Sequence, residues 1–306
     1  MTTFHNEMHE DGWPKLGVII LNWNAAALTM RCVTSLLKWQ RLQPFIYVVD
    51  NGSTEHGLHT IENSPARVRL IRSPENLGYA GGNNLGMREA IDDGCECLLL
   101  LNSDASISEE NMEKLLEILQ KGENLGCVGP AISEGTKVYL GGRDIGLHIN
   151  TRNTRSRNVS GDEVLYVDYV PGMVFLTKQD VVRDIGFLDE QYFFSGEIAD
   201  FCMRAWKKGY KCAIYTATKA DHELERDNPF RSSLYQYYSL RNRFLYIRKH
   251  HPNLKWILEL FWTIWGMQRY ARAALMGLSK ESLAYRMAIA DQARGIFGDR
   301  NVLFSV

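Results

Sequence analysis

The sequence predicts an α/β protein with a mostly parallel central sheet flanked by helices and followed by a C-terminal helical extension. Apolar strand-like segments alternate with amphipathic helix-like segments over the first 130 or so residues, and the connections between them are short. The run LLLLNSD at residues 98–104 gives the second indication. Its four leucines have no polar face, so a strand made of them must be covered on both sides, as in the middle of a parallel sheet.

The elements expected in the first half follow from apolar periodicity and turn residues. The helix after LLLLNSD has a clear start, because Ser108 can cap it and two glutamates occupy its first turn. The segment Pro74–Gly82 is rich in turn-forming residues and is expected to be a loop. The predicted strands are Leu16–Asn22, Phe45–Asp50, Val68–Ile71, Cys95–Leu101 and Cys127–Gly129, and the predicted helices are Ala25–Trp39, Asn83–Asp93 and Ser108–Lys121.

The second half is less regular until its last 80 residues, which read as helices. Thr151–Arg157 holds three arginines and has no apolar face, so it is expected to be a mobile loop that could close over a ligand. These patterns divide the chain into a tail (1–14), an α/β domain (15–225) and a helical region (226–306). The predicted strands are Val164–Val170, Met173–Thr177 and Cys212–Tyr215, and the predicted helices are Gln179–Ile185, Glu197–Lys208, Ser232–His250, Leu254–Leu278 and Glu281–Phe297.

Composition narrows the class of protein. The net charge of −1 gives no basic field, which disfavours non-specific nucleic-acid binding. Six cysteines without a CxxC pair are expected to be reduced core thiols of a cytosolic protein. The first fourteen residues contain acids and no apolar run, which argues against a signal peptide. A cytoplasmic location is therefore expected.

Polar residues follow four of the predicted strands, at the edge where open α/β sheets bind ligands. Each cluster alone is an ordinary turn, but together they offer short polar side chains and open backbone amides to a nucleotide. A Rossmann dinucleotide site is disfavoured because no GxGxxG follows the first strand. The clusters are Asn22-Trp23-Asn24, Asp50-Asn51-Gly52-Ser53, Asn76 with Gly78, Gly81, Gly82 and Asn83, and Asn102-Ser103-Asp104.

The ordered motifs IILNWN, VVDNGS, ENLGYAGGNN and LLLLNSD resemble those of family 2 glycosyltransferases, especially the rhamnosyltransferase-like branch. VPGMVFLTKQ, GFLDEQYFFSGEIADFCMRA and the histidine that follows extend the resemblance over about residues 15–225, and YYSLRNRFLYIRKH resembles the tails of such enzymes. The resemblance implies a GT-A fold, a nucleotide-diphosphate sugar donor, a divalent metal (Mg²⁺ or Mn²⁺) and inversion at the anomeric carbon.

Carried over position by position, the resemblance assigns roles to single residues. Asp50 matches the acid that contacts the donor base, Asp104 the last acid of the metal-binding DxD triplet, and His222 a histidine that can complete the metal shell. The first acid of the triplet is replaced by Asn102, which brings no charge and implies modest metal affinity. The sugar or acceptor pocket is expected at Gly172, Met173, Phe194 and Gly196.

Glu197 and Asp200 are the candidate catalytic acids, with Glu197 as general base and Asp200 as the supporting acid. They lie three residues apart at the start of a helix, so both can face the cleft. The family often has a second adjacent acid where this chain has Ile198, so the assignment does not transfer cleanly. The alternative is that both acids only favour the positive helix end, a contribution of about 0.3–1 kcal/mol each.

Two further features each allow more than one interpretation. Arg241 and Arg243, or arginines of the 151–157 loop, could stabilise the departing diphosphate, although a solvated helix face would also explain Arg241 and Arg243. Trp256–Met267 is apolar apart from Glu259 and Thr263 and is too short to span a bilayer before charged residues interrupt it. It could pack on the catalytic domain, lie in a membrane interface on the inner face of the membrane, or form a homodimer contact.

These observations predict an inverting, metal-dependent glycosyltransferase, a hexosyl- or rhamnosyltransferase of polysaccharide or cell-envelope biosynthesis. It would move sugar from a UDP- or dTDP-linked donor to a hydroxyl of a glycan or lipid-linked saccharide. Two alternatives remain: a sugar-1-phosphate nucleotidyltransferase and a non-catalytic sugar-nucleotide-binding protein on the same scaffold.

Overall fold

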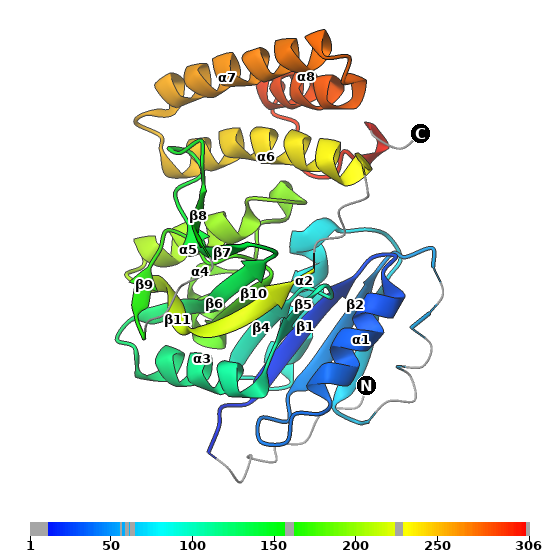
Figure 1. Cartoon of the computed structure of the whole chain (residues 1–306), viewed down its shortest axis with the longest axis vertical. Helices are drawn as coiled ribbons and strands as arrows, with labels where there is room; N and C mark the ends of the chain where they lie inside the picture. The colour runs from blue at the N-terminus through cyan, green and yellow to red at the C-terminus, as the bar shows by residue number, and fades with distance from the viewer. Residues whose placement is uncertain are drawn as a thin grey trace.

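The computed structural model describes residues 12–55, 57, 58, 61, 65–156, 162–223 and 229–303. Most of the predicted tail and the predicted domain boundary near residue 225 lie outside the described residues. Strands form one twisted sheet in the lower part of Figure 1, and three long helices stack beyond one edge of it. The chain therefore has the predicted architecture of a sheet with flanking helices and a C-terminal helical extension.

The first four long strands form the parallel half of the sheet, in the order β3 (Val68–Ser73), β2 (Phe45–Asn51), β1 (Leu16–Asn22) and β4 (Cys97–Leu101). The β4 leucines are buried on both faces, as their lack of a polar side predicts. Leu99 and Leu101 join one hydrophobic core, and Leu98 and Leu100 join the other. The polar residues that follow β1, β2 and β4 consequently meet at one edge.

The second half of the sheet departs from the parallel pattern. Strand β10 (Val174–Lys178) lies antiparallel between β4 and β6 (Leu125–Glu134), and β11 (Lys211–His222) runs parallel to β6. The short strand β5 (Ala105–Ile107), absent from the sequence prediction, pairs antiparallel with β11. In that register His222 lies opposite Ala105, which brings His222 beside Asp104.

Helices cover both faces of the sheet. The core on one face receives α1 (Ala26–Leu36) and α3 (Glu109–Lys121), and Ser108 caps α3 as predicted, its hydroxyl accepting from the Asn111 amide. The opposite core receives the helices α2 (Gly78–Asp92), α4 (Gln179–Ile185) and α5 (Glu197–Lys207). Helix α5 begins beside the carboxyl edge of the sheet, so its first residue can reach the site there.

The prediction of a loop at Pro74–Gly82 is wrong for its second half, because α2 already begins at Gly78. Gly81 and Gly82 lie within the helix. A Cβ on Gly82 would come within 2.3 Å of the Leu21 side chain, and one on Gly86 within 2.6 Å of Ile19. These glycines let the helix pack closely on the sheet, and this packing outweighs their poor helix propensity.

The prediction of a mobile loop at 151–157 is also wrong for the residues of this segment that the structure describes. Arg152–Ser156 forms strand β8, which pairs with β7 (Lys137–Gly142), a strand that the sequence prediction missed. Predicted strand 164–170 shortens to β9 (Val164–Tyr166), and two single turns of 3₁₀ helix lie at Glu190–Tyr192 and Asn301–Leu303. Arg157 lies outside the described residues.

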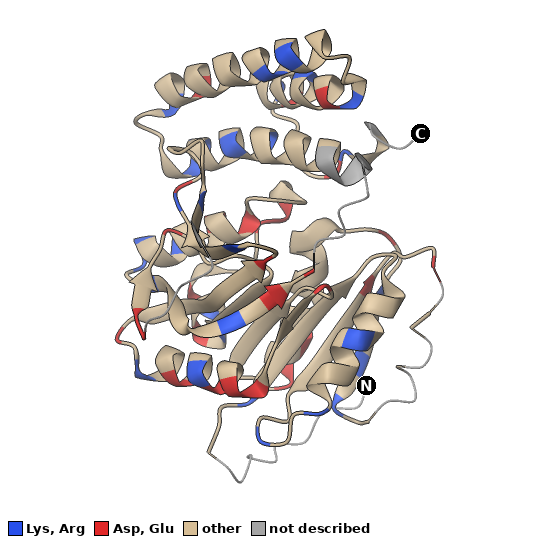
Figure 2. Cartoon of the chain, in the orientation of Figure 1, with Lys and Arg blue, Asp and Glu red and all other residues tan. Residues whose placement is uncertain are grey.

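The three C-terminal helices, α6 (Pro229–His250), α7 (Lys255–Leu275) and α8 (Ser279–Ala293), stack on one another (Figure 1). Their shared core includes Tyr238, Phe244 and Trp262, and Phe193, which precedes α5, packs into it. Charged residues of both signs are spread over the lower part of the molecule, whereas α7 is mostly uncharged (Figure 2). Across the described residues, no helix has both the length and the apolarity to cross a membrane.

Candidate active site

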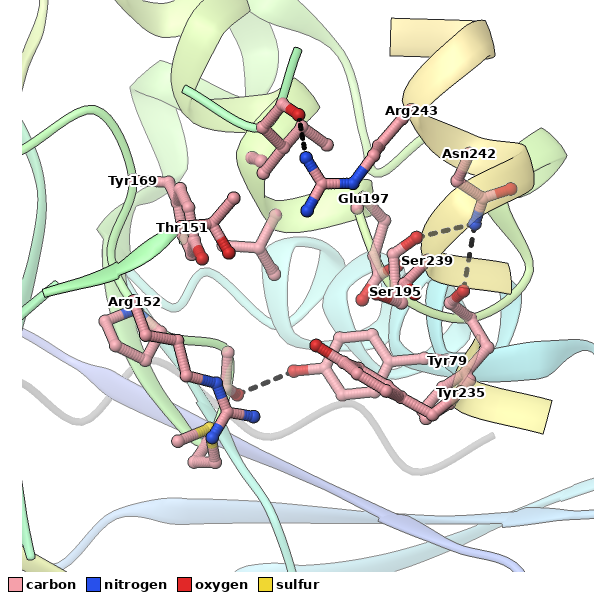
Figure 3. Close-up of a pocket in the computed structure, with 18 of the residues that line it drawn as sticks. Tyr79, Thr151, Arg152, Tyr169, Ser195, Glu197, Tyr235, Ser239, Asn242 and Arg243 are labelled. Carbon is pink, nitrogen blue, oxygen red and sulfur yellow. Dashed lines mark hydrogen bonds between the residues drawn. The ribbon is translucent and has the colours of Figure 1, made fainter. Parts of the chain in front are cut away.

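A pocket opens where the carboxyl edge of the sheet meets β7, β8, α5 and α6 (Figure 3). It collects residues from segments far apart in the sequence. All four residues predicted for the sugar or acceptor pocket line it, together with Asn102 and Glu197. The wall also contains Tyr79, Tyr139, Gly141, Ile145, Thr151, Arg152, Tyr169, Pro171, Ser195, Ile198, Ala199, Tyr235, Ser239, Asn242 and Arg243.

Glu197 is the acid that reaches this pocket. It is the first residue of α5 and follows Gly196, whose φ of 103° is one that L side chains rarely adopt. The side chain is 6% exposed, and its Oε2 atom has no hydrogen-bond partner within the described structure. Burial, together with the nearby charge of Asp200, raises the pKa of Glu197 to about 7. A buried carboxylate with a free oxygen and this pKa is suited to accept a proton near neutral pH.

Asp104 and His222 come together at the end of the sheet. His222 Nε2 lies 3.3 Å from Asp104 Oδ1, and His222 Nδ1 donates to Glu134 Oε1 at 2.7 Å. Burial opposes a charge on the imidazole, but the two carboxylates raise the pKa of His222 to about 9. A carboxylate oxygen and an imidazole nitrogen oriented by a second carboxylate form a donor set that fits a divalent metal.

Arg152 and Tyr79 connect this pair to the pocket. Arg152, which lines the pocket, lies 3.7 Å from Glu134, the hydrogen-bond partner of His222. Tyr79 donates its hydroxyl to the Gly172 carbonyl at 2.7 Å. Burial, followed by the charges of Glu197 and Asp104, raises the pKa of Tyr79, so both acids lie within electrostatic range of the same ring. The candidate base and the candidate metal ligand therefore both lie near the Tyr79 ring.

The ends of β1 and β2 form a second polar group. Asn22 Nδ2 donates to Ser53 Oγ at 3.0 Å and to Asp50 Oδ1 at 3.4 Å, and Arg72 approaches Asp50 at 3.5 Å. Trp23, between Asn22 and Asn24, is half exposed. These side chains leave a polar shelf with one exposed aromatic ring beside it, which suits a nucleotide base and ribose.

Several residues predicted to bind the nucleotide instead hold the backbone. Asn51 is 1% exposed and uses both ends of its amide on the segment before α2, accepting from Leu77 N and donating to Asn76 and to the Gly78 carbonyl. Asn83 is buried and donates to the Tyr79 carbonyl. Gly81 and Gly82 are buried in the same helix. Their amide and backbone groups shape the site from behind.

The prediction that Asp200 faces the cleft beside Glu197 is wrong. Asp200 is fully buried and does not line the pocket. Its carboxylate accepts from Tyr192, Arg204, Lys249 and His250. The end of α6 covers this side of α5. Asp200, which was expected in the cleft, therefore belongs to a buried cluster of charged groups. Burial alone would raise the pKa of Asp200, but its partners hold that pKa well below the usual value.

The two arginines of YYSLRNRF differ from the prediction in different ways. Arg241 is fully buried and does not line the pocket. Its guanidinium donates to the carbonyls of Gly298 and Tyr192, so it ties the chain end to α6. Arg243 does line the pocket, but it donates to the carbonyls of Ile145 and His148 and stacks over the Trp262 ring at 4.1 Å.

Sequence reasoning missed several residues of the site. Glu134 lies in no motif, because its role depends on strand pairing. Tyr79 lies inside ENLGYAGGNN but was not singled out there. Arg152, in contrast, is one of the arginines of 151–157 that the sequence offers for the diphosphate, and it lines the pocket. Asn242 could have been found from the sequence, because it lies inside the motif YYSLRNRF. It donates to the carbonyls of Tyr192, Phe194 and Ser195 and so fixes the loop before α5. Within this motif the sequence prediction rests on the two arginines and not on this asparagine.

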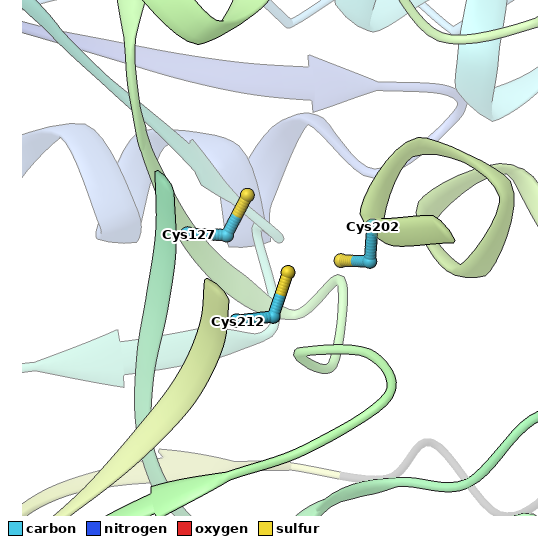
Figure 4. A group of neighbouring side chains, drawn as sticks. All are labelled: Cys127, Cys202 and Cys212. Carbon is cyan, nitrogen blue, oxygen red and sulfur yellow. The ribbon is translucent and has the colours of Figure 1, made fainter. Parts of the chain in front are cut away.

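A cluster of three thiols lies outside the pocket. The sulfur atoms of Cys127, Cys202 and Cys212 lie within 4.8 Å of one another, in the core between the sheet and α5 (Figure 4). Cys127 and Thr177 approach at 3.7 Å. All six cysteines of the chain are buried and carry free thiols, as the sequence predicts.

Comparisons with known proteins agree with this geometry. A family described as "Glycosyl transferase family 2" matches residues 17–182. The low-salt glycan biosynthesis hexosyltransferase Agl10 of Haloferax volcanii is 31% identical over 209 residues, which span 65% of this chain and 65% of Agl10. The dTDP-rhamnosyl transferase RfbF of Shigella flexneri is 23% identical over 92% of this chain and 96% of its own length.

Solved structures confirm the fold. GalNAc-T7 with UDP, GalNAc and Mn²⁺ superposes with a TM-score of 0.62 at 15% identity, covering 78% of this chain and 48% of that protein. The mannosyltransferase PcManGT of Pyrobaculum calidifontis, in complex with GDP-Man and Mn²⁺, has a TM-score of 0.58 at 14% identity and covers 94% and 86%. The chain therefore belongs to glycosyl transferase family 2 and is a glycosyltransferase with the GT-A fold.

Proposed function

We propose that the protein is an inverting, metal-dependent glycosyltransferase that moves a sugar from a UDP- or dTDP-linked donor to a hydroxyl of a glycan or lipid-linked saccharide. The observation that carries the proposal is the buried carboxylate of Glu197, whose Oε2 atom has no hydrogen-bond partner among the described residues. It lies in a pocket that also receives Asn102, two residues before Asp104. The similarity to RfbF, named as a dTDP-rhamnosyl transferase, supports a donor of this class.

Glu197 is the general base of the proposed reaction. Its carboxylate takes the proton of the acceptor hydroxyl as that oxygen bonds to the anomeric carbon, and the carbon–oxygen bond to the diphosphate breaks with its electron pair on the nucleoside diphosphate. Attack from the face opposite the diphosphate inverts the anomeric carbon. Gly172, Met173 and Phe194 line the space around Glu197 in which the acceptor would lie.

Asp104 and His222 would hold the divalent metal, with Asn102 able to contribute an amide oxygen. When bound, the metal neutralises charge on the donor's diphosphate. Arg152 adds a positive charge from the pocket wall, where its side chain is half exposed. The polar shelf of Asn22, Asp50 and Ser53, with Trp23 beside it, would receive the nucleoside.

Asp104→Asn is expected to abolish the gain in stability that Mn²⁺ confers on the complex with UDP or dTDP. For the native chain, a ligand at one hundred times its dissociation constant adds about 2.7 kcal/mol, measured as a shift in thermal unfolding. Asp221→Asn is the matched control, because Asp221 is exposed on β11, next to His222. An unchanged metal-dependent shift in Asp104→Asn would remove Asp104 from the metal site.

Glu134→Gln is expected to weaken Mn²⁺ binding by about 10–100-fold while the fold is retained. The carboxylate orients the imidazole through Nδ1, and an amide accepts this hydrogen bond less strongly. Isothermal titration of Mn²⁺ in the presence of UDP measures the effect. The exposed Glu110→Gln on α3 should bind the metal like the native chain. Equal affinity in both variants would contradict a positioning role for Glu134.

Donor hydrolysis separates the proposal from a sugar-nucleotide-binding protein without activity. The native chain, incubated with UDP- or dTDP-sugars and Mn²⁺ or Mg²⁺, is expected to release nucleoside diphosphate slowly, and to release it faster when an acceptor saccharide is added. Donor binding without any release would support the non-catalytic alternative. Release of pyrophosphate from a sugar phosphate and a nucleoside triphosphate would support the nucleotidyltransferase.

A further inference from the structure

Helix α7 presents an apolar face that no described residue covers. Large apolar side chains along this face are 45–75% exposed, whereas the buried residues of α7 lie on the other side of the helix. We call this surface the outer face of α7. It consists of Trp256 (75% exposed), Ile257 (69%), Leu260 (63%), Phe261 (45%), Ile264 (48%) and Met267 (57%).

The spacing explains why these residues form one surface. They follow one another at intervals of one or three residues, which places them on one side of an α-helix. The opposite side holds Trp262, Gly266 and Ala273, all buried in the packing among the C-terminal helices. Contiguous exposed apolar surfaces of this kind mark interaction sites.

Charge surrounds the outer face but does not enter it. Glu259, the acid of α7, lies outside the face and accepts from Arg248 Nε at 2.6 Å, within the helical region. Lys255 lies over the Trp256 ring at the start of the helix, and the exposed Arg269 and Arg272 follow toward its end. In Figure 2 the basic residues of α7, drawn in blue, are visible toward its C-terminal end. The border of the face is therefore basic.

The apolar surface continues past the end of α7. Leu275 (89% exposed), Met276 (61%) and Leu278 (41%) lie in and beside the turn that leads to α8. A helix with an apolar outer side, tryptophan and phenylalanine on it, and basic residues at its border has the composition of helices that lie in the headgroup region of a membrane.

We propose that the outer face of α7 binds the protein to the surface of an anionic lipid bilayer. The charge pattern favours this occupant over a second copy of the chain. A twofold dimer through this face would bring the basic borders of both copies together. Anionic headgroups complement the same border, and the acyl region accepts the apolar side chains.

The outer face of α7 lies close to the pocket. Arg243, which lines the pocket from α6, stacks over Trp262 on the inner side of α7 at 4.1 Å. Trp262 also donates its indole N–H to the Gly146 carbonyl, next to the pocket residue Ile145. A bilayer under α7 would therefore lie one helix away from the pocket wall. The inference concerns where the protein sits and does not depend on the proposed reaction.

Vesicle sedimentation with the full chain tests the proposal. The native chain is expected to bind extruded vesicles of phosphatidylcholine mixed with phosphatidylglycerol, and to bind pure phosphatidylcholine vesicles or high-salt samples at least about tenfold more weakly. The triple variant Ile257→Ser, Leu260→Ser, Ile264→Ser should lose at least about tenfold in affinity for the mixed vesicles.

Matched tryptophans provide the control. Trp256→Gln should weaken binding to the mixed vesicles, whereas Trp206→Gln, which replaces a tryptophan that is 67% exposed on α5, should not. Circular dichroism and UDP binding report whether each variant remains folded. Equal binding by the native chain and the triple variant would overturn the proposal. Absence of vesicle binding, with a dimer in sedimentation velocity that the triple variant dissociates, would assign the face to a second copy.

Discussion

Glu197→Gln is expected to lower sugar transfer by about 10²–10⁴-fold, because the amide cannot take the proton of the acceptor hydroxyl. The substitution keeps the size of the side chain, so donor binding should change little. Transfer by the native chain should rise with pH and level off above about 7, the pKa that burial and Asp200 give to Glu197. The measurements are kcat/KM as a function of pH and donor affinity by titration.

The same substitution should stabilise the protein at high pH. In the unfolded chain the carboxyl loses its proton near pH 4.5, but in the fold it keeps the proton until about pH 7. Its contribution to stability is therefore full below pH 4.5 and is lost as the pH rises through 7. The difference amounts to about 3 kcal/mol. Glu197→Gln lacks this loss, so urea unfolding should show it more stable than the native chain at pH 8.

Two comparisons make this prediction specific. Glu123→Gln, at an exposed position, should match the native chain in transfer and in stability at both ends of the pH range. The stability gain of Glu197→Gln should shrink toward pH 4, where the native carboxyl is protonated in both states. Full transfer by Glu197→Gln, or a stability difference that does not vary with pH, would contradict the role assigned to this carboxylate.

Asp200→Ala is expected to destabilise the fold by about 3–5 kcal/mol, the cost of breaking a buried charge network by removing one partner. Asp200 is fully buried and joins Arg204 of α5 to Lys249 and His250 of α6. Its loss leaves cations without their shared carboxylate and loosens α6 from α5. Denaturant unfolding at pH 7 measures the change, because the lowered pKa of Asp200 keeps this contribution present there and removes it only in acid.

The comparison with an exposed pair tests whether burial causes the effect. Asp184 contacts Lys208 at 2.9 Å on the surface, and Asp184→Ala should change stability by about 1 kcal/mol or less. The folded fraction of Asp200→Ala should retain transfer activity, in contrast to Glu197→Gln. A stable Asp200→Ala variant that has lost transfer would return Asp200 to the catalytic pair that the sequence suggested.

The sequence alone determined the framework of the protein. Local periodicity predicted the early strands and the helix at 108–121, because a strand covered on both sides and an amphipathic helix each leave a pattern in consecutive residues. The polar residues after these strands predicted a ligand-binding edge. Their order along the chain resembled a family, and that family is confirmed. The same information predicts Glu197 as the general base, and the structure places this residue in the pocket wall.

The tertiary structure decided which polar side chains face the pocket and which are buried away from it. Asp200 and Arg241 have the sequence pattern of site residues, but α6 covers the first and the chain end covers the second. Glu134 and Arg152 gained their positions from strand pairings between segments far apart in the chain. Local sequence sets what a segment can form, whereas the segments that fold against it set what its side chains meet. That second condition is a property of the whole chain, so no single motif carries it.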